Sequence, residues 1–263
     1  MSPLIKSFLQ VCVAASFLCG QTVSWAAPDK QLRLGTLAPK NSLYHRQLME
    51  VGEAWRAAQG GNAKRRLVAV GFGTMAFSMN EVLLEPYGGQ ILGMSVSDTT
   101  MLTAILALGG LIGFSWASRV LGKGTDPFYM ATIGALVGIP AFALIMLSAP
   151  LAMTALFLLG TFLIGFGGGL FSHGTLTATM QLAPSNQRGL ALGAWGAVQA
   201  TAAGIAIGLG GVIRDLVVAI GATNWLPEGV IGPATGYSFV YFLEIGLLIA
   251  TIFSMATLLP KRK

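Results

Sequence analysis

The side chains best suited to chemistry in this chain are polar groups placed inside long apolar runs. Three are carboxylates, Glu81, Glu85 and Glu244, one is the amide of Gln199, and one is the imidazole of His173. A charged group is costly in hydrocarbon, so such residues usually face a cavity or a polar partner. We therefore expect these five residues to be membrane-embedded polar groups.

The surroundings of each carboxylate favour a particular role. Glu81 lies about 21 Å into its run if that run is helical, and Glu85 lies at the end, where Pro86 and Gly88-Gly89 are expected to break the helix. A structural turn is the favoured interpretation there. Glu244 could relay protons or anchor a pigment, but a hydrogen bond to a neighbouring helix is favoured.

Motifs typical of enzymes are not found in the sequence. Asp98, Asp126 and Asp215 fall in three separate gaps between apolar runs, whereas diphosphate chemistry needs aspartates clustered around Mg²⁺. The glycines from Gly165 to Gly169 lie inside an apolar run, without the lysine of a phosphate-binding loop. No nucleophile triad is evident, and the chain is predicted not to be an enzyme.

The composition indicates a protein dissolved in lipid. Hydrophobic residues make up 54% of the chain, charged residues 10%, and the mean hydropathy is +0.71, whereas a soluble domain carries about 25% charge. The net charge of +6 is scattered over helix ends and forms no basic face for nucleic acid. Cys12 and Cys19, both in the N-terminal apolar run, are not expected to form a disulfide framework or metal site.

Six apolar runs are long enough to cross a bilayer as helices, because about 20 helical residues span the hydrocarbon. They cover residues 67–84, 98–118, 127–148, 151–180, 189–213 and 236–259. Cations fall in alternate gaps: Lys64-Arg65-Arg66, Arg119 with Lys123, Arg188, and Lys261-Arg262-Lys263. The positive-inside rule then predicts that both ends of this unit, and the C-terminus, are cytoplasmic. Arg214 and Asp215, in an opposite gap, are expected to form an interfacial ion pair.

The N-terminal region has a different character. Residues 1–27 have the outline of a secretory signal, with Lys6, an apolar stretch and a small-x-small site at Ser24-Trp25-Ala26. Residues 28–66 read as a short α/β fragment and a linker. The strand at 31–37, the Ala38-Pro39-Lys40-Asn41-Ser42 loop and the following helix resemble the start of the solute-binding (DctP-type) subunits of TRAP transporters.

A working export signal would place the 64–66 cations outside and invert the helices that follow. The two regions therefore predict opposite orientations, and three explanations of this conflict remain open. The signal-like run is not used for export, the helices are forced against their charge bias, or the chain is a fusion. The first and third are favoured.

Three motifs in the six-helix unit, 67–260, carry a resemblance to a known family. They are Glu81-Val-Leu-Leu-Glu-Pro-Tyr-Gly-Gly89, Gly165-Phe-Gly-Gly-Gly-Leu-Phe171 leading into Gly174-Thr-Leu-Thr177, and Arg188-Gly-Leu-Ala-Leu-Gly-Ala-Trp-Gly-Ala-Val-Gln-Ala-Thr201. The unit resembles the C-terminal half of the PucC family, which are major-facilitator-type membrane proteins of phototrophs involved in assembly of light-harvesting complexes. The resemblance implies an all-α membrane fold with six of the family's twelve helices. A lone half would need a second copy or another six-helix half to cover its cavity side.

Small residues spaced four apart let helix backbones approach closely. Packing within the unit is the favoured role, and a flat face for another helix or a pigment ring is the alternative, centred on the 165–171 motif. The spaced pairs are Gly109/Gly113, Gly134/Gly138, Gly165/Gly169, Gly189/Gly193 and Gly204/Gly208. The candidates for binding a pigment or a helical partner are Gly165, Gly167, Gly168, Gly169, Phe171, His173 and Trp195. His173 could bind the magnesium of bacteriochlorophyll, or it could hydrogen bond to a neighbouring helix.

The apolar runs predict a multi-pass membrane protein, and the resemblance to the PucC family implies that it lies in the inner or intracytoplasmic photosynthetic membrane and assembles light-harvesting complexes without catalysis. Its expected partners are the lipid bilayer and light-harvesting polypeptides or the reaction-centre complex. One alternative is a half-size transporter that works as a dimer, with Glu81, Gln199 and Glu244 on a shared pathway. A non-functional fusion remnant is the other, and a solute-binding activity of the N-terminal fragment is disfavoured.

Overall fold

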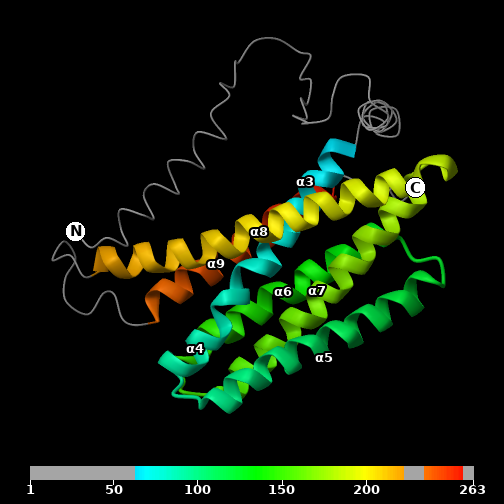
Figure 1. The fold of residues 1–263 in the computed structure, drawn as a ribbon. Coiled ribbons are helices and arrows are strands. Elements are labelled where there is room, and N and C mark those ends of the chain that lie inside the picture. Colours follow the sequence, from blue (N-terminus) through cyan, green and yellow to red (C-terminus); the bar gives the residue numbers. More distant parts are fainter. Residues whose placement is uncertain (1–62, 222–233, 257–263) are drawn as a thin grey trace, which may run out of the picture. The chain divides into compact units, whose positions relative to one another are not determined.

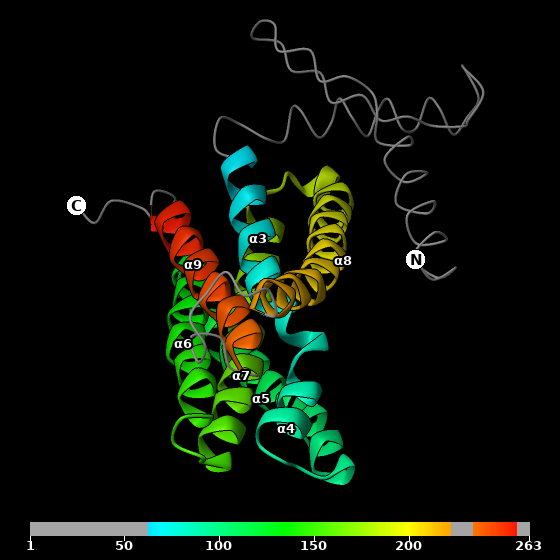
Figure 2. The ribbon, with the colours of Figure 1, turned by 90° about the vertical axis from the view of Figure 1, so that its left-hand side faces the viewer.

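The computed structural model describes residues 63–221 and 234–256, which all belong to one compact unit, residues 47–263 (Figures 1 and 2). Within these residues the chain is helical, without a strand. The predicted signal, the α/β fragment and the C-terminal cations lie outside the described residues. The elements are α3 (Ala63–Ser78), the 3-10 helix η1 (Met79–Val82), α4 (Leu84–Ile91), α5 (Val96–Leu121), α6 (Pro127–Ser148), α7 (Thr154–Leu182), η2 (Ser185–Gln187), α8 (Arg188–Gly221) and α9 (Thr235–Ala256).

Five helices, α5 to α9, are long and apolar enough to cross a membrane, and there are six such spans if the bent pair formed by residues 65–82 and 84–91 is counted as one. The prediction of an all-α membrane protein is confirmed, and the predicted six spans agree with the structure when the bent pair is counted as one span. Helix α6 coincides with the predicted run, and α8 is the longest of the described helices, with 34 residues. At 1.5 Å per residue α8 is about 51 Å long, well beyond the hydrocarbon thickness.

The first span differs from the prediction. The chain bends by 41° between its two helices, and the break lies at η1 and Leu83 rather than at Pro86 and Gly88-Gly89. Pro86 is in the first turn of α4, where its missing N–H is not needed, and its ring would clash with the carbonyl four residues earlier if the helix were continuous. Both glycines are helical. In addition, α3 begins at Ala63, so the basic residues Arg65 and Arg66 belong to its first turn.

The loop ends are set by local capping. Ser95 and Asp98 form a capping box at the start of α5, in which each side chain accepts from the other residue's backbone N–H. Asp126 caps α6 by accepting from the N–H groups of Phe128 and Tyr129, and Pro127 follows at the first helical position. These caps mark the starts of α5 and α6, which follow short connections at residues 92–95 and 122–126.

The alternation of charge is visible in the structure. Because successive spans run in opposite directions, the described cations at the starts of α3 and α8 and at the end of α5 share one end of the unit. We call this the basic end, and its described cations are Arg65, Arg66, Arg119, Lys123 and Arg188. The opposite, acidic end carries Glu85, Asp98 and Asp215, with Arg214 beside them.

Glycines bring α7 against two neighbours at once (Figure 1). A Cβ atom added at Gly109 or Gly113 of α5 would overlap the α7 backbone at Phe162 or Phe166. On the other side of α7, a Cβ added at Gly167 would lie 2.8 Å from the carbonyl oxygen of Gly134 in α6. The three helices α5, α6 and α7 therefore form a tightly packed layer with α7 in the middle. This packing depends on glycine at the contact positions, where any side chain would overlap a neighbouring backbone.

An aromatic cluster joins the broken span to the C-terminal helix. The ring of Tyr87 lies 5.2 Å from that of Phe157 and 5.4 and 5.7 Å from those of Tyr237 and Tyr241. The Tyr87 hydroxyl donates to the carbonyl of Ile145 at 3.0 Å. All three tyrosine side chains are fully buried. Figure 2 shows α3 between α8 and α9 in the upper part of the view, and α3 contacts both of these helices.

Candidate functional site

The glycines proposed as a flat binding face are already covered by neighbouring helices. A Cβ at Gly165 would overlap the carbonyl of Leu106 in α5, and one at Gly169 would lie 2.6 Å from the carbonyl oxygen of Gly110. Gly167 faces α6, and the atoms nearest to a Cβ added at Gly168 belong to the side chain of Phe77, the first of them at 3.6 Å. Packing inside the unit, the favoured interpretation, accounts for the positions of these glycines.

The aromatic candidates lie in different environments. Phe171 is buried in the core, with its ring 5.8 Å from that of Phe77. His173 is half-buried against Phe114, with ring centroids 4.1 Å apart, and its buried Nδ1 has no hydrogen-bond partner. The hydrogen bond expected for His173 is therefore not made at that nitrogen.

Trp195 makes a polar contact between α7 and α8. Its indole N–H donates to Oγ1 of Thr175 at 3.2 Å. Thr175 in turn donates to the carbonyl of Phe171, one turn earlier in α7. The sequence analysis named Trp195 as a candidate and quoted Thr175 within a family motif, but it gave Thr175 no role.

The membrane-embedded carboxylates also separate. Glu244 is completely buried, and its Oε1 accepts from the amide of Asn80 at 3.1 Å. The predicted interhelical hydrogen bond of Glu244 is thus confirmed, with Asn80 as the partner that the sequence analysis missed. The signal was present, because Asn80 is the one amide in the first apolar run.

Glu81 and Glu85 are exposed, and Glu85 accepts from the hydroxyl of Thr103 at 3.2 Å. Gln199 is half-buried on α8. Among the described residues, Glu244 hydrogen bonds to Asn80 and not to Glu81 or Gln199. The three residues expected on a transport pathway are therefore not joined by a polar network.

The predicted ion pair of Arg214 with Asp215 is confirmed at 2.7 Å, but it lies inside α8 rather than in a gap. The guanidinium also donates to Oε1 of Gln90 at 2.9 Å and to the Tyr237 hydroxyl at 3.0 Å, and it lies 4.7 Å from the Tyr237 ring centroid. Tyr237 completes the triangle by donating to Gln90 at 2.7 Å. At the acidic end this network holds α8, α4 and α9 together.

The outer side of α8 is the most open surface of the unit. A Cβ added at any of six glycines would meet no atom within 4 Å among the described residues beyond its own stretch of helix. These glycines recur at intervals of three, four or eight residues, which puts them on one side of a helix. We call this side the α8 glycine face: Gly189, Gly193, Gly196, Gly204, Gly208 and Gly211. The opposite side of α8 faces the unit through Ala202, Ala206 and Gly210.

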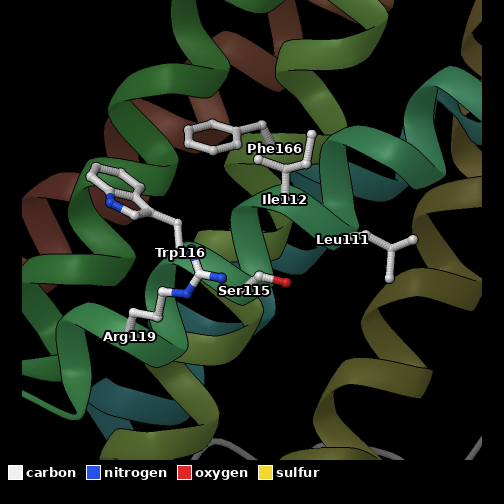
Figure 3. Close-up of a pocket in the computed structure, with 6 residues that line it drawn as sticks. All are labelled: Leu111, Ile112, Ser115, Trp116, Arg119 and Phe166. Atoms are coloured by element: carbon white, nitrogen blue, oxygen red, sulfur yellow. The ribbon is translucent and has the colours of Figure 1, made fainter.

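A cavity of about 370 Å³ opens on the outer side of α5, near the basic end (Figure 3). Five of its lining residues come from α5, and Phe166 comes from α7. The ring of Phe166 is stacked on that of Trp116, with centroids 5.8 Å apart. The lining consists of Leu111, Ile112, Ser115, Trp116, Arg119 and Phe166. No group of three or more metal-binding side chains occurs in the part of the chain that the structure describes.

Six apolar spans, buried polar pairs and an open glycine face define a multi-pass α-helical membrane protein. The chain belongs to the PucC family, because the family profile described as PUCC protein matches residues 3–263. The match includes the N-terminal residues that resemble a solute-binding protein, and the domain division near residue 66 stays a prediction.

Named relatives agree with this membership. The chain is 47% identical to Protein PucC of Cereibacter sphaeroides over 257 residues. The aligned region covers 97% of this chain and 53% of that protein. It is 61% identical over 166 residues to Protein PucC of Rhodovulum sulfidophilum, covering 63% of this chain and 37% of the relative. Identity is 32% over 199 residues to the bacteriochlorophyll synthase 44.5 kDa chain of Rhodobacter capsulatus, covering 69% and 41%.

The chain spans about half the length, or less, of these relatives. No solved structure matches it.

Proposed function

We propose that this chain is a membrane factor for the assembly of photosynthetic light-harvesting complexes and that it acts by binding helices rather than by catalysis. Membership of the PucC family is the observation that carries this proposal. The name of the Rhodobacter capsulatus relative supports a link with bacteriochlorophyll. The absence of clustered aspartates from the sequence supports a role without diphosphate chemistry.

The α8 glycine face is the surface that we propose for the helical partner. Small residues allow a second helix to approach closely in lipid, where no hydrophobic effect drives association. On α7 the equivalent glycines are occupied by α5 and α6, whereas on α8 they are open. Light-harvesting polypeptides are the proposed occupants, and a second copy of the chain or another six-helix half would compete for the same face.

The experiment is complementation. The full chain is produced in a phototrophic bacterium that lacks its own PucC-family protein, and light-harvesting complexes are quantified by their near-infrared absorbance in isolated membranes. We expect the chain to restore absorbance and the double substitution Gly204→Leu, Gly208→Leu to remove that gain without reducing the amount of protein. Gly246→Leu is the matched control, because Gly246 in α9 also has no atom within 4 Å of its would-be Cβ.

Failure of the unsubstituted chain to restore absorbance would overturn the assembly role. An equal loss with Gly246→Leu would overturn the assignment of the partner to α8.

We further propose that the basic end is cytoplasmic and that the unit lies in the inner or intracytoplasmic membrane. The described cations at that end support this orientation. A reporter active only in the periplasm and one fluorescent only in the cytoplasm, each fused after Lys263, distinguish the two orientations. We expect the cytoplasmic reporter to be active, and a periplasmic signal would reverse the assignment.

A further inference from the structure

We propose that the cavity between α5 and α7 is a binding site for one anionic phospholipid, with the phosphate held by Arg119 and Ser115 and an acyl chain lying against Trp116 and Phe166 (Figure 3). The site is separate from the α8 glycine face and does not depend on the proposed assembly role.

The shape of the cavity matches an amphiphile. Its lining residues on α5 follow helical spacing, so they form one stripe along the outer side of that helix. From Arg119, in the last turn of α5, the stripe runs to Leu111, about 12 Å deeper into the span at 1.5 Å per residue. One end of the cavity is therefore at the membrane interface and the other is in the hydrocarbon.

The polar groups of the cavity select a negative charge. Arg119 is the one charged residue in the lining, and no carboxylate accompanies it. Among the described residues, the ion pair that forms is that of Arg214 with Asp215. The guanidinium of Arg119 therefore has no acidic partner within this part of the chain. The next carboxylate along the chain, that of Asp126, accepts from the backbone N–H groups that begin α6. A planar guanidinium that lacks a carboxylate is well suited to a phosphate diester.

The apolar groups of the cavity explain why the ligand should be a lipid and not a free anion. Leu111 is 67% exposed and Trp116 is 44% exposed, although both are large and hydrophobic. In the membrane these side chains face acyl chains. The stacked rings of Trp116 and Phe166 add a flat wall at the depth where a lipid's glycerol and first methylenes would lie. Basic pockets at the cytoplasmic ends of membrane helices are suitable sites for anionic head groups.

The test measures selective lipid binding by the full chain in nanodiscs. Discs of phosphatidylcholine receive increasing amounts of phosphatidylglycerol whose acyl chains are brominated, and quenching of tryptophan fluorescence is recorded. The part of the quenching that is lost in Trp116→Phe reports on this cavity, since the other four tryptophans remain in that variant. Brominated phosphatidylcholine in discs of phosphatidylglycerol provides the reverse measurement.

We expect the Trp116 signal to show a preference for phosphatidylglycerol, and Arg119→Gln to reduce that preference about fivefold, the effect of one cation near an anionic lipid surface. Arg119→Lys should retain most of it. Arg188→Gln is the matched control, because Arg188 is exposed at the same end but does not line the cavity. Addition of inorganic phosphate should leave the preference unchanged.

Equal quenching by both lipids would overturn the proposal. So would a preference that survives Arg119→Gln, or that falls equally in Arg188→Gln, because selectivity would then come from the basic end as a whole. Displacement by inorganic phosphate would show a site for a free anion in place of a lipid. Arg119 is exposed and makes no ion pair among the described residues, so its substitution should not unfold the protein, and Arg119→Lys checks this directly.

Discussion

Helices α7 and α8 carry similar glycine patterns, yet the structure uses them in opposite ways. Of the most apolar window of each helix, 44% is buried in α7 and 11% in α8. The glycines of α7 meet the backbones of α5 and α6, whereas those of the α8 glycine face meet nothing. The difference teaches that small-residue spacing marks a surface capable of close contact, and that the neighbours present decide whether the contact is internal.

The largest effect should come from adding a side chain to each of these surfaces. Gly165→Val forces a branched side chain into the α5 backbone at Leu106, and we expect a loss of about 3 kcal/mol in the free energy of unfolding. Gly204→Val meets open space and should change it by well under 1 kcal/mol. Unfolding in detergent followed by circular dichroism gives both values, and equal losses would erase the distinction between the helices.

The second effect concerns a polar contact buried inside the unit, the hydrogen bond between Asn80 and Glu244. Asn80→Leu leaves the buried carboxyl of Glu244 without its donor, and we expect a loss of about 1–2 kcal/mol. Glu244→Gln keeps an acceptor for Asn80 and should cost less. Adding Glu244→Leu to Asn80→Leu should recover part of the loss. A double variant whose loss equals the sum of the single losses would argue against coupling between the two residues.

The third effect tests the two sides of α8 at neighbouring positions. Gly210→Ala places a Cβ 2.5 Å from the carbonyl oxygen of Met79, so we expect a loss of about 1 kcal/mol. Gly208→Ala lies on the open side and should be neutral or stabilising by about 0.5 kcal/mol, because alanine favours a helix. Thermal unfolding of both variants in the same detergent is sufficient. The reverse order would mean that α8 is rotated relative to the structure described.

The smallest effect concerns the attachment of α8 to α7. Trp195→Phe keeps the ring and removes the N–H that donates to Thr175, with an expected loss of about 0.5 kcal/mol. Thr175→Val should produce a similar loss, and the two should not add. Trp116→Phe is the control, because that indole faces outward from α5. A larger loss in the control than in Trp195→Phe would show that the hydrogen bond does not hold α8.

Hydropathy was sufficient to predict the six spans, because a helix is the one way for a single apolar segment to satisfy its backbone in lipid. The cost of a charge in hydrocarbon was sufficient to expect a polar partner for Glu244, and the adjacency of Arg214 and Asp215 was sufficient to expect an ion pair. Hydropathy could not give the partners Asn80, Gln90 and Tyr237, since these depend on which faces of distant helices meet.

Two other features needed the packing of the unit. The bend was expected at Pro86, but it falls before this residue. Proline is tolerated in the first turn of a helix, here α4, and is unfavourable in the interior of a continuous helix. The cavity at Arg119 combines residues of two helices, and the sequence analysis named Arg119 only as one of the cations between apolar runs. Periodicity identifies a stripe on one helix, but it does not identify the neighbour that closes it.

The pairing of Asn80 with Glu244 also dictates an order of events during synthesis. The two residues are 164 positions apart. A ribosome that adds about 5–20 residues per second needs about 10–30 s to travel that far. Helices α5, α6 and α7 follow one another and can associate within that interval, whereas the amide of Asn80 must wait in the bilayer until α9 emerges. The bent span is thus the first of the described elements to be made, and its buried polar bond is among the last to close.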